Sequence, residues 1–371
     1  MTDGGVLKAS GVILPSGERR DLFVVDGQIT YDAGAPGAPD ASSITDAFGD
    51  AWIVAGLVDA HCHIGLDEHG AVPDDVSEEQ AVADRDAGTL LVRDAGSAAD
   101  TRWIDEREDL PRVIRAGRHL ARPKRYIRNY AHEIEPDELP AYVAQEAQRG
   151  DGWVKLVGDW IDRDAEDLTP LWPRDALQAA IDTAHAYGAR VTAHVFGPDA
   201  LPDLFDAGID CIEHGTGLSA DLIDQMVTQH IALVPTAKQL EHFPDYAAAG
   251  EAKFPAYAAR MRDLYERRRD TVRSAFEAGV AIYAGTDAGG VLPHGLIGDE
   301  VLALAELGLS PADALGAASW RARPWLGRQG GNLDAGDPAD FVVYDADPLA
   351  DLAVLKHPRR IVLRGQVVFT R

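Results

Sequence analysis

The chain has 371 residues, a formal charge of −26 and two cysteines. So negative a protein would repel nucleic acid phosphates, and so few cysteines do not indicate a disulfide framework. The N-terminal residues lack the basic and apolar regions of a signal peptide, and no apolar run approaches the ~20 residues needed to cross a bilayer. We therefore expect a soluble, cytoplasmic protein that binds neither nucleic acid nor membrane and has room for a large core plus an accessory unit.

The two ends of the chain have the same short β pattern. Strands are predicted at residues 6–14, 20–31 and 43–54, with turns at residues 15–17 and 26–27. The pattern resumes at residues 340–344 and 360–369. Because neither set can form a core alone, we expect the two sets to combine.

Between these ends, strands alternate with helices. Two helices are clear, over residues 173–187, which Gly188 ends, and over residues 219–230, with Ser219 as N-cap. Eight strands are predicted, at residues 52–59, 89–94, 112–116, 154–157, 190–195, 210–213, 232–235 and 281–284. Alternation of this kind predicts a parallel sheet, and eight units close a (β/α)8 barrel of about 250 residues.

Several of these strands end in residues that can bind metal. His61 and His63 project from one face of the first strand, because residues i and i+2 share a face. On its own, such a pair is equally compatible with polar surface or a hydrogen-bonded core. His194, His214 and Asp287 end three further strands, and Lys155 points inward from another. The sequence therefore predicts a metal site at the C-terminal ends of the strands, where barrel enzymes carry their chemistry.

These motifs, in this order, resemble the amidohydrolase superfamily, within it the imidazolonepropionase-like and Xaa-Pro dipeptidase-like metallohydrolases. The resemblance rests on Gly-Leu-Val-Asp-Ala-His61-Cys-His63, Thr89-Leu-Leu-Val-Arg-Asp-Ala-Gly, Val-Lys155-Leu, Ala-His194, Ile-Glu-His214-Gly-Thr, Gly-Thr-Asp287-Ala-Gly and Gly336-Asp-Pro-Ala-Asp-Phe-Val-Val-Tyr. It implies an α/β fold: a (β/α)8 TIM barrel over residues 56–327, beside a composite β-sandwich made of residues 1–55 and 328–371.

The resemblance also implies a centre of two divalent ions, expected to be zinc. His61 and His63 would hold the more buried ion with Asp287, and His194 and His214 would hold the second. Lys155 would bridge both as a carbamate formed with carbon dioxide, because a lysine cation has no lone pair to offer. A bridging hydroxide would attack the substrate carbonyl, while Asp287 moves the proton.

Simpler roles remain open for some of these residues. Lys155 could form a salt bridge at the barrel rim, which would leave one metal, and Asp287 could be a helix N-cap. Strand alternation turns Glu213 away from the centre, so we expect a structural salt bridge there. Cys62 is expected to be a core residue. Surface or packing positions are expected for His119, His185, His230 and His357.

The loops that would select the substrate give weaker signals. Where the family shows a Gly/His-rich loop after strand three, this chain has four cations within seven residues, Arg122, Lys124, Arg125 and Arg128. Arg125, Tyr126 and Arg128 could hold an anionic substrate group, or the cations could neutralise nearby acids. Residues 238–269, rich in aromatics, could form a lid or a packing face. His294 is a further candidate for substrate contact.

We expect a hydrolase of amide-type bonds. Its small-molecule substrate would be an N-acyl amino acid, a dipeptide or a cyclic amide, and this substrate could carry a carboxylate. A lactonase or esterase on the same site is an alternative. A deaminase is disfavoured, because such enzymes of the superfamily carry a glutamate shortly after the strand-five histidine, and His194 is followed by Val-Phe-Gly-Pro-Asp. A non-enzymatic binding module is disfavoured because all six site residues are retained. Homo-oligomerisation stays open.

Overall fold

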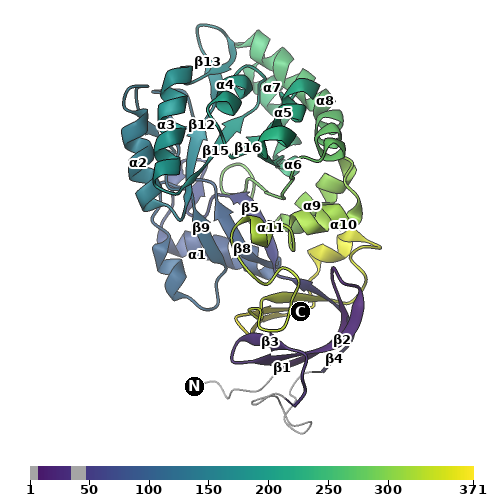
Figure 1. The fold of residues 1–371 in the computed structure, drawn as a ribbon. Coiled ribbons are helices and arrows are strands. Elements are labelled where there is room, and N and C mark those ends of the chain that lie inside the picture. Colours follow the sequence, from purple (N-terminus) through teal and green to yellow (C-terminus); the bar gives the residue numbers. More distant parts are fainter. Residues whose placement is uncertain (1–6, 35–46) are drawn as a thin grey trace.

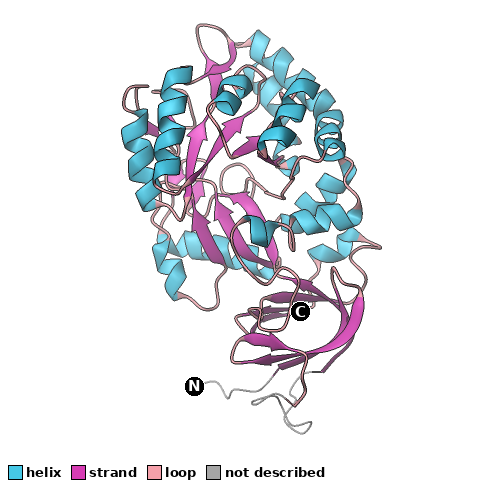
Figure 2. Ribbon diagram, viewed as in Figure 1, coloured by secondary structure: helices cyan, strands magenta, loops and turns pink. Residues whose placement is uncertain are grey.

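The computed structural model describes residues 7–34 and 47–371, so residues 6 and 43–46 of the predicted strands lie outside the described residues. In Figure 1, helices surround a set of parallel strands in the upper part of the view, and a curved β-sheet lies below them. Figure 2 shows the same division between a mixed helix and strand part and an all-strand part. Among the described residues, no helix is long and apolar enough to cross a membrane.

The parallel strands fall into two sheets. The larger has the order β11-β10-β12-β15-β16-β17, and the smaller β5-β8-β9. Their bounds are β5 (Leu57–Cys62), β8 (Thr89–Asp94), β9 (Arg112–Arg115), β10 (Leu120–Ala121), β11 (His132–Glu133), β12 (Trp153–Val157), β15 (Arg190–Val195), β16 (Cys211–His214) and β17 (Ala232–Val234). Residues 281–288 link the two sheets, since Ile282 bridges to Leu233 and Ala288 bridges to Cys62. Between β9 and β12 the backbone contact is Asp151 N–H to Arg115 O, 2.8 Å.

Helices follow most of these strands. They are α1 (Asp74–Asp86), α2 (Leu139–Arg149), α3 (Arg174–Ala186), α4 (Leu201–Asp206), α5 (Ala220–Gln229), α6 (Ala237–Leu240), α7 (Phe243–Gly250), α8 (Pro255–Ala278), α9 (Ile297–Glu306), α10 (Pro311–Ala317) and α11 (Ala322–Trp325). The two helices predicted from sequence are confirmed as α3 and α5. Gly188 has the left-handed φ of 73° that ends α3, and the Ser219 hydroxyl accepts the Leu222 N–H at 3.4 Å.

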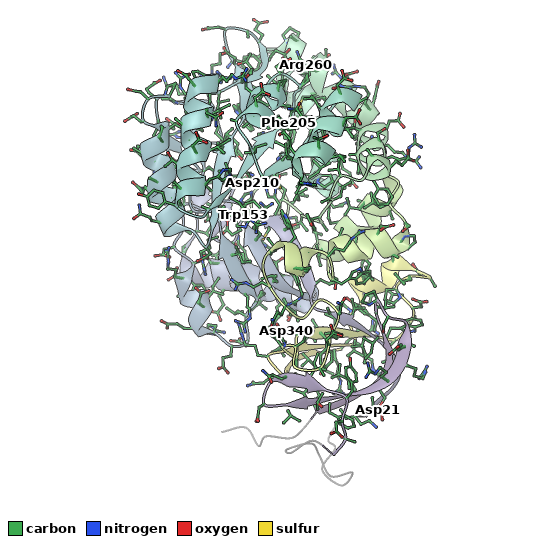
Figure 3. All side chains as sticks on the ribbon, viewed as in Figure 1. Asp21, Trp153, Phe205, Asp210, Arg260 and Asp340 are labelled. Carbon is green, nitrogen blue, oxygen red and sulfur yellow. The ribbon has the colours of Figure 1, made fainter. Side chains whose placement is uncertain are left out.

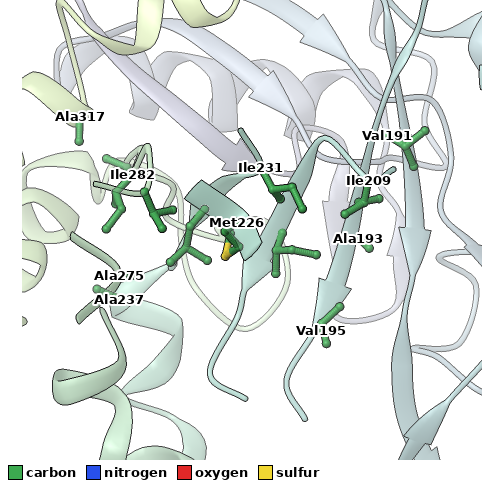
Figure 4. Packing of buried hydrophobic residues seen from close by; sticks show 14 of the residues in the cluster. Val191, Ala193, Val195, Ile209, Met226, Ile231, Ala237, Ala275, Ile282 and Ala317 are labelled. Atoms are coloured by element: carbon green, nitrogen blue, oxygen red, sulfur yellow. The ribbon is translucent and has the colours of Figure 1, made fainter. Parts of the chain in front are cut away.

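Between sheet and helices lies a continuous apolar core. Figure 4 shows Val191 and Ala193 of β15 together with Met226 of α5 in this core, and all three are fully buried. Along each strand these apolar residues alternate with polar ones. One face of the strand therefore packs against the helices in the core, and the other face points into the space between the strands. The helices thus hold the strand ends in fixed positions.

Two strand predictions need correction. The strand predicted over residues 52–59 is two strands that belong to different sheets, β4 (Ala47–Ala55) and β5, separated at Gly56. A Cβ at Gly56 would lie 2.5 Å from Leu90 Cδ1, so the crossing requires glycine. Residues 281–284 form only isolated bridges, although they occupy the position expected of the eighth strand.

The terminal strands combine, as expected, but into one continuous sheet instead of two facing ones. Its order is β20-β19-β18-β4-β1-β2-β3. The remaining bounds are β1 (Leu7–Ile13), β2 (Glu18–Val25), β3 (Gln28–Thr30), β18 (Phe341–Tyr344), β19 (Arg360–Leu363) and β20 (Gln366–Thr370). Edge strand β3 is covered by the segment before β18, through Ile29 N–H to Asp337 O at 2.9 Å and Gly336 N–H to Ile29 O at 2.8 Å. The sheet therefore curls back on itself and encloses a small core of its own.

The sheet and the parallel strands meet at Gly56. Arg323 of α11 is buried there and donates from Nε to Gly56 O at 3.1 Å, with Asp340 Oδ2 3.8 Å from its Nη1. Figure 3 labels Asp340 at this junction, below the strands that carry Trp153. This contact fixes the start of β5, which carries the first predicted site residues.

Phe341 tests whether the composite sheet stabilises the whole chain. Its side chain is 0% exposed in the sheet core, so Phe341→Ala should lower the free energy of unfolding by about 3–5 kcal/mol. The matched control is Val367→Ala on the exposed side of β20, which should change it by less than about 0.5 kcal/mol. Guanidinium unfolding followed by circular dichroism measures both, and equal midpoints for the two variants would contradict this role.

Candidate metal centre

Four histidines and one aspartate converge at the C-terminal ends of the strands. His61 Nε2 and His63 Nε2 are 3.3 Å apart, and each lies close to Asp287 Oδ1, at 3.1 and 3.0 Å. His194 Nδ1 and His214 Nε2 are 2.9 Å apart. Ligand atoms of His61, His214 and Asp287 all lie within 4.8 Å of one another. The structure thus brings together the five predicted imidazole and carboxylate ligands, from β5, β15, β16 and the 281–288 segment.

Lys155 lies with this cluster and is buried. Its side chain is 1% exposed, and its charge acts on His61, His63, His194 and His214. Burial lowers the pKa of Lys155, although the nearby carboxylates of Glu213 and Asp287 oppose the shift. The alternative of an ammonium at the solvent-exposed rim does not agree with this burial.

The second ring nitrogen of three histidines is held by a buried acceptor. His61 Nδ1 is 2.7 Å from Glu213 Oε2, and His63 Nδ1 is 2.8 Å from the Gly96 carbonyl. His214 Nδ1 is 2.6 Å from Thr236 Oγ1, whose own proton goes to the Pro235 carbonyl. Because the Nδ1–H group of each ring donates its hydrogen bond to this acceptor, the Nε2 lone pair is left facing the cluster.

Glu213 is the one residue of the cluster that the sequence placed incorrectly. The expected salt bridge exists, with Arg93 Nη2 at 2.6 Å, but the expectation that Glu213 faces away from the centre is wrong, because it also hydrogen-bonds His61. The physical reason lies in the next residue. His214 has a left-handed φ of 66°, so strand alternation ends there and both side chains point inward.

The backbone around Asp287 is equally unusual. Asp287 has a φ of 57°, a conformation that costs about 1–3 kcal/mol for a residue other than glycine and is concentrated at functional sites. The turn that carries Asp287 lies directly against β5. A Cβ at Gly289 would lie 2.2 Å from the His63 carbonyl oxygen, so this close approach requires glycine at position 289. Asp59 adds a clamp, since its carboxylate accepts the backbone N–H groups of His61 and Thr286, each at 3.1 Å. The turn therefore holds Asp287 against the two histidines and does not serve as a helix N-cap.

For His194, His214 and Asp287 the electrostatics favour the protonation states that bind metal, whereas the carboxylates of Glu213 and Asp287 outweigh burial and raise the pKa of His61. Burial lowers the pKa of His214 to about 3 and that of His194 well below its usual value. Burial alone would raise the pKa of Asp287, but His61 and His63 outweigh it and hold that pKa well below its usual range. At neutral pH the imidazoles of His194 and His214 are therefore neutral, and the carboxylate of Asp287 is ionised. Imidazole nitrogens with a carboxylate oxygen fit a divalent cation such as zinc.

A cavity of about 330 Å³ opens above the cluster. His63, His194 and Asp287 form its floor. Its walls consist of aromatic and apolar side chains from β13 (Asp159–Asp162), α7, α8, the loop after β10 and the segments that follow β15 and Asp287. They are Tyr126, Ile127, Tyr130, Trp160, Phe196, Tyr246, Tyr257 and Val291. A small molecule could therefore reach the predicted ligands from solvent.

The predicted substrate contacts divide in two. Tyr126 lines the cavity, and its ring centroid is 5.6 Å from that of His194. Arg125 and Arg128 do not line it. Arg125 instead binds Asp162 at 3.0 Å and the Trp160 carbonyl at 3.0 Å, because it lies against the hairpin of β13 and β14 (Asp167–Pro170).

His294 also lies outside this cavity. Its Nδ1 is 2.8 Å from Asp84 Oδ2 of α1, which ties the loop after Asp287 to that helix. The position close to Asp287 in sequence therefore does not bring His294 to the cavity, since the chain turns away at Leu292 and Pro293 into a neighbouring hollow.

His119, Trp160 and Gln239 were missed as neighbours of the site. His119 is fully buried with its ring 5.1 Å from both His63 and Tyr126, so it is a packing residue, as expected, but one that borders the centre. No periodic pattern marks these residues, because they lie on loops, short strands or a four-residue helix. The aromatic segment at residues 238–269 was a usable signal, and Tyr246 and Tyr257 both pack together and line the cavity.

Comparison with known proteins agrees with this geometry. Residues 52–368 match the amidohydrolase family profile. An uncharacterized protein of Mycobacterium tuberculosis is 56% identical over 97% of this chain and 95% of its own length. Ochratoxinase of Aspergillus niger is 26% identical over 63% of this chain and 49% of its own length, and the ochratoxinase crystal structure has a TM-score of 0.77 over 98% and 96% of the two chains at 20% identity.

A further solved structure supports the fold. The crystal structure of a Xaa-Pro dipeptidase with bound methionine has a TM-score of 0.80, covers 98% of each chain and is 21% identical. Similarity at this level concerns the arrangement of strands and helices. The profile match, in contrast, covers most of the chain, including all six predicted site residues. The chain therefore belongs to the amidohydrolase family, and it is a hydrolase.

Proposed function

We propose that this protein is a metal-dependent hydrolase that cleaves an amide-type bond in a small N-acylated compound, dipeptide or cyclic amide. The observation that carries the proposal is the convergence of four imidazoles and one carboxylate, three of the imidazoles with their Nδ1 protons engaged elsewhere. Such preorganised lone pairs are what a resident divalent cation requires. The strand order around this site supports a closed (β/α)8 barrel as its frame.

Two divalent ions, with zinc the expected metal, would be held as the family resemblance implies. His61, His63 and Asp287 would hold one ion, and His194 and His214 the other. Lys155 would connect them as a carbamate, and its lowered pKa supports this role because only the neutral amine reacts with carbon dioxide. When bound, the ions supply a water molecule of lowered pKa and polarise the scissile carbonyl.

The chain's own residues handle the proton. Asp287 Oδ1 lies at the cavity floor and is ionised, so it can accept a proton from the attacking water. The same carboxyl can then deliver that proton to the leaving nitrogen. The acceptors behind the histidines keep their rings from rotating as this charge moves, which limits the reorganisation that the transition state needs.

Metal analysis of the purified, metal-loaded protein tests the centre. We expect about two divalent ions per chain, and about one in Lys155→Ala together with loss of activity, because the bridge would be gone. Labelling with ¹³C-bicarbonate should add a carbamate carbon signal to the wild type that Lys155→Ala lacks. Lys356→Ala, which removes an exposed cation, is the control and should keep both ions. One ion in active wild-type protein would mean that the centre is not binuclear.

The bond type is tested with a substrate panel. N-acyl amino acids, dipeptides and lactams should be hydrolysed faster than lactones or esters of matched shape when metal-loaded protein is supplied with each. Because the site residues are those of an amidohydrolase, turnover should also disappear on treatment with a chelator and return with metal. Activity restricted to esters or lactones would overturn the proposed bond type.

Glu213 provides a test that does not depend on the substrate. Glu213→Gln leaves buried Arg93 without its anionic partner, so it should cost about 3–5 kcal/mol of unfolding free energy. It also weakens the acceptor behind His61, so metal affinity, measured by competition with a chelator, should fall about 10- to 100-fold. The control Glu241→Gln breaks an exposed pair and should cost less than about 1 kcal/mol with no effect on metal. Unchanged metal affinity in Glu213→Gln would refute the positioning role.

A further inference from the structure

The cavity above the candidate metal centre is walled by aromatic rings from separate segments. The rings of Tyr126 and Trp160 meet edge to face with centroids 4.8 Å apart. Tyr246 of α7 and Tyr257 of α8 complete the wall. Aromatic rings prefer such offset or edge-to-face partners, so a flat ring in this space would gain contacts on more than one side.

Positive side chains are missing from this wall. Within the described residues 47–371, the lining of the cavity includes no lysine or arginine, and its charged carboxylates are Glu68 and Asp287. Two of the four cations of the nearby loop are paired elsewhere, since Arg122 binds Glu135 at 2.7 Å and Arg125 binds Asp162 at 3.0 Å, and the other two, Lys124 and Arg128, do not line the cavity. A substrate carboxylate in this space would lose its hydration without gaining a cation from the wall.

Gln239 is the neutral polar group of the wall. Its Nε2 donates to Tyr246 Oη at 2.8 Å, while its buried Oε1 has no hydrogen-bond partner within the described part of the chain. Buried amide oxygens are rarely left without a donor. Because that oxygen has almost no exposed surface, Gln239 adds a neutral amide and no charge to the wall.

We propose that this cavity binds an uncharged aromatic group of the substrate, in contact with Tyr126, Trp160 and Tyr246, and discriminates against substrates with a carboxylate in that position. The inference rests on the proposed function for its reaction, but it concerns recognition, which can be measured separately. It also replaces the sequence-based expectation that Arg125 and Arg128 select an anionic group.

The test uses pairs of nearly identical shape that differ in charge. 4-Nitrobenzamide and 4-carboxybenzamide place the ring on the acyl side, and 4-nitroacetanilide and 4-carboxyacetanilide place it on the amine side. In the series that the metal-loaded protein binds more tightly, the nitro compound should exceed the carboxylate at least tenfold in affinity by calorimetry, and in kcat/KM where turnover occurs. The nitro compound should also exceed acetamide at least tenfold, and Trp160→Leu should remove most of that preference.

A charge placed at the mouth gives an independent check. Val291 lines the cavity but is 60% exposed, so a longer side chain fits there without repacking. Val291→Lys should improve the carboxylate relative to the nitro compound at least threefold, whereas Val291→Gln, of similar size and uncharged, should leave the ratio unchanged. Equal improvement in both variants would overturn the electrostatic explanation.

The outcomes separate this inference from the proposed function. If neither these amides nor those of the substrate panel are hydrolysed but the nitro compounds still bind preferentially, the proposed function fails and the inference about the cavity stands. If amides are hydrolysed but the carboxylates bind as well as the nitro compounds or better, the inference fails and the proposed function stands.

Discussion

The site depends on a buried chain of charge that runs from Arg93 through Glu213 to His61. Arg93 is fully buried and also donates from Nε to the Ala60 carbonyl at 2.6 Å, so it braces the strand that carries His61. Glu213 accepts further hydrogen bonds from Thr192 and His61. Burial alone would raise the pKa of Glu213, but Arg93 and His61 keep it well below its usual value. A permanent anion is thus fixed behind the first histidine, which orients that ring and fixes which nitrogen carries the proton.

Strained strand ends complete the arrangement. His214 and Asp287 both have left-handed backbone conformations. So does Thr236, whose hydroxyl oxygen accepts the hydrogen bond from His214 Nδ1. Each costs free energy that the surrounding core must offset. The cost is tolerated because parallel strands packed under helices form a rigid frame, and Gly289 lets the Asp287 turn press against β5. The rigid frame therefore tolerates a strained backbone, and the strain is concentrated at the strand ends, where the chemistry is expected.

The floor and the walls of the cavity come from different kinds of structure. The floor is formed by strand ends, whose positions the sheets fix. The walls come from the β13–β14 hairpin, the α6–α8 segment and the loop that carries Tyr126. The α6–α8 segment shares a separate apolar cluster with Leu168 of the hairpin, whereas Tyr126 and Trp160 pack against the main core. Such segments can change without disturbing the candidate metal ligands. Within one family, the same arrangement of strand ends can therefore serve substrates of different chemistry.

The sequence alone predicted most of the strand ends, helices α3 and α5, and the convergence of the five candidate imidazole and carboxylate ligands, because periodicity and the i, i+2 rule depend only on local geometry. It could not determine where Glu213 points, since the left-handed turn at His214 is imposed by neighbouring strands. It also could not determine the direction of Arg125 or His294. Each found a carboxylate partner distant in sequence, Asp162 and Asp84, and long-range ion pairing of this kind has no local signature. That the chain ends form one curled sheet instead of two facing ones, and which aromatic rings line the cavity, were likewise decided only by tertiary packing.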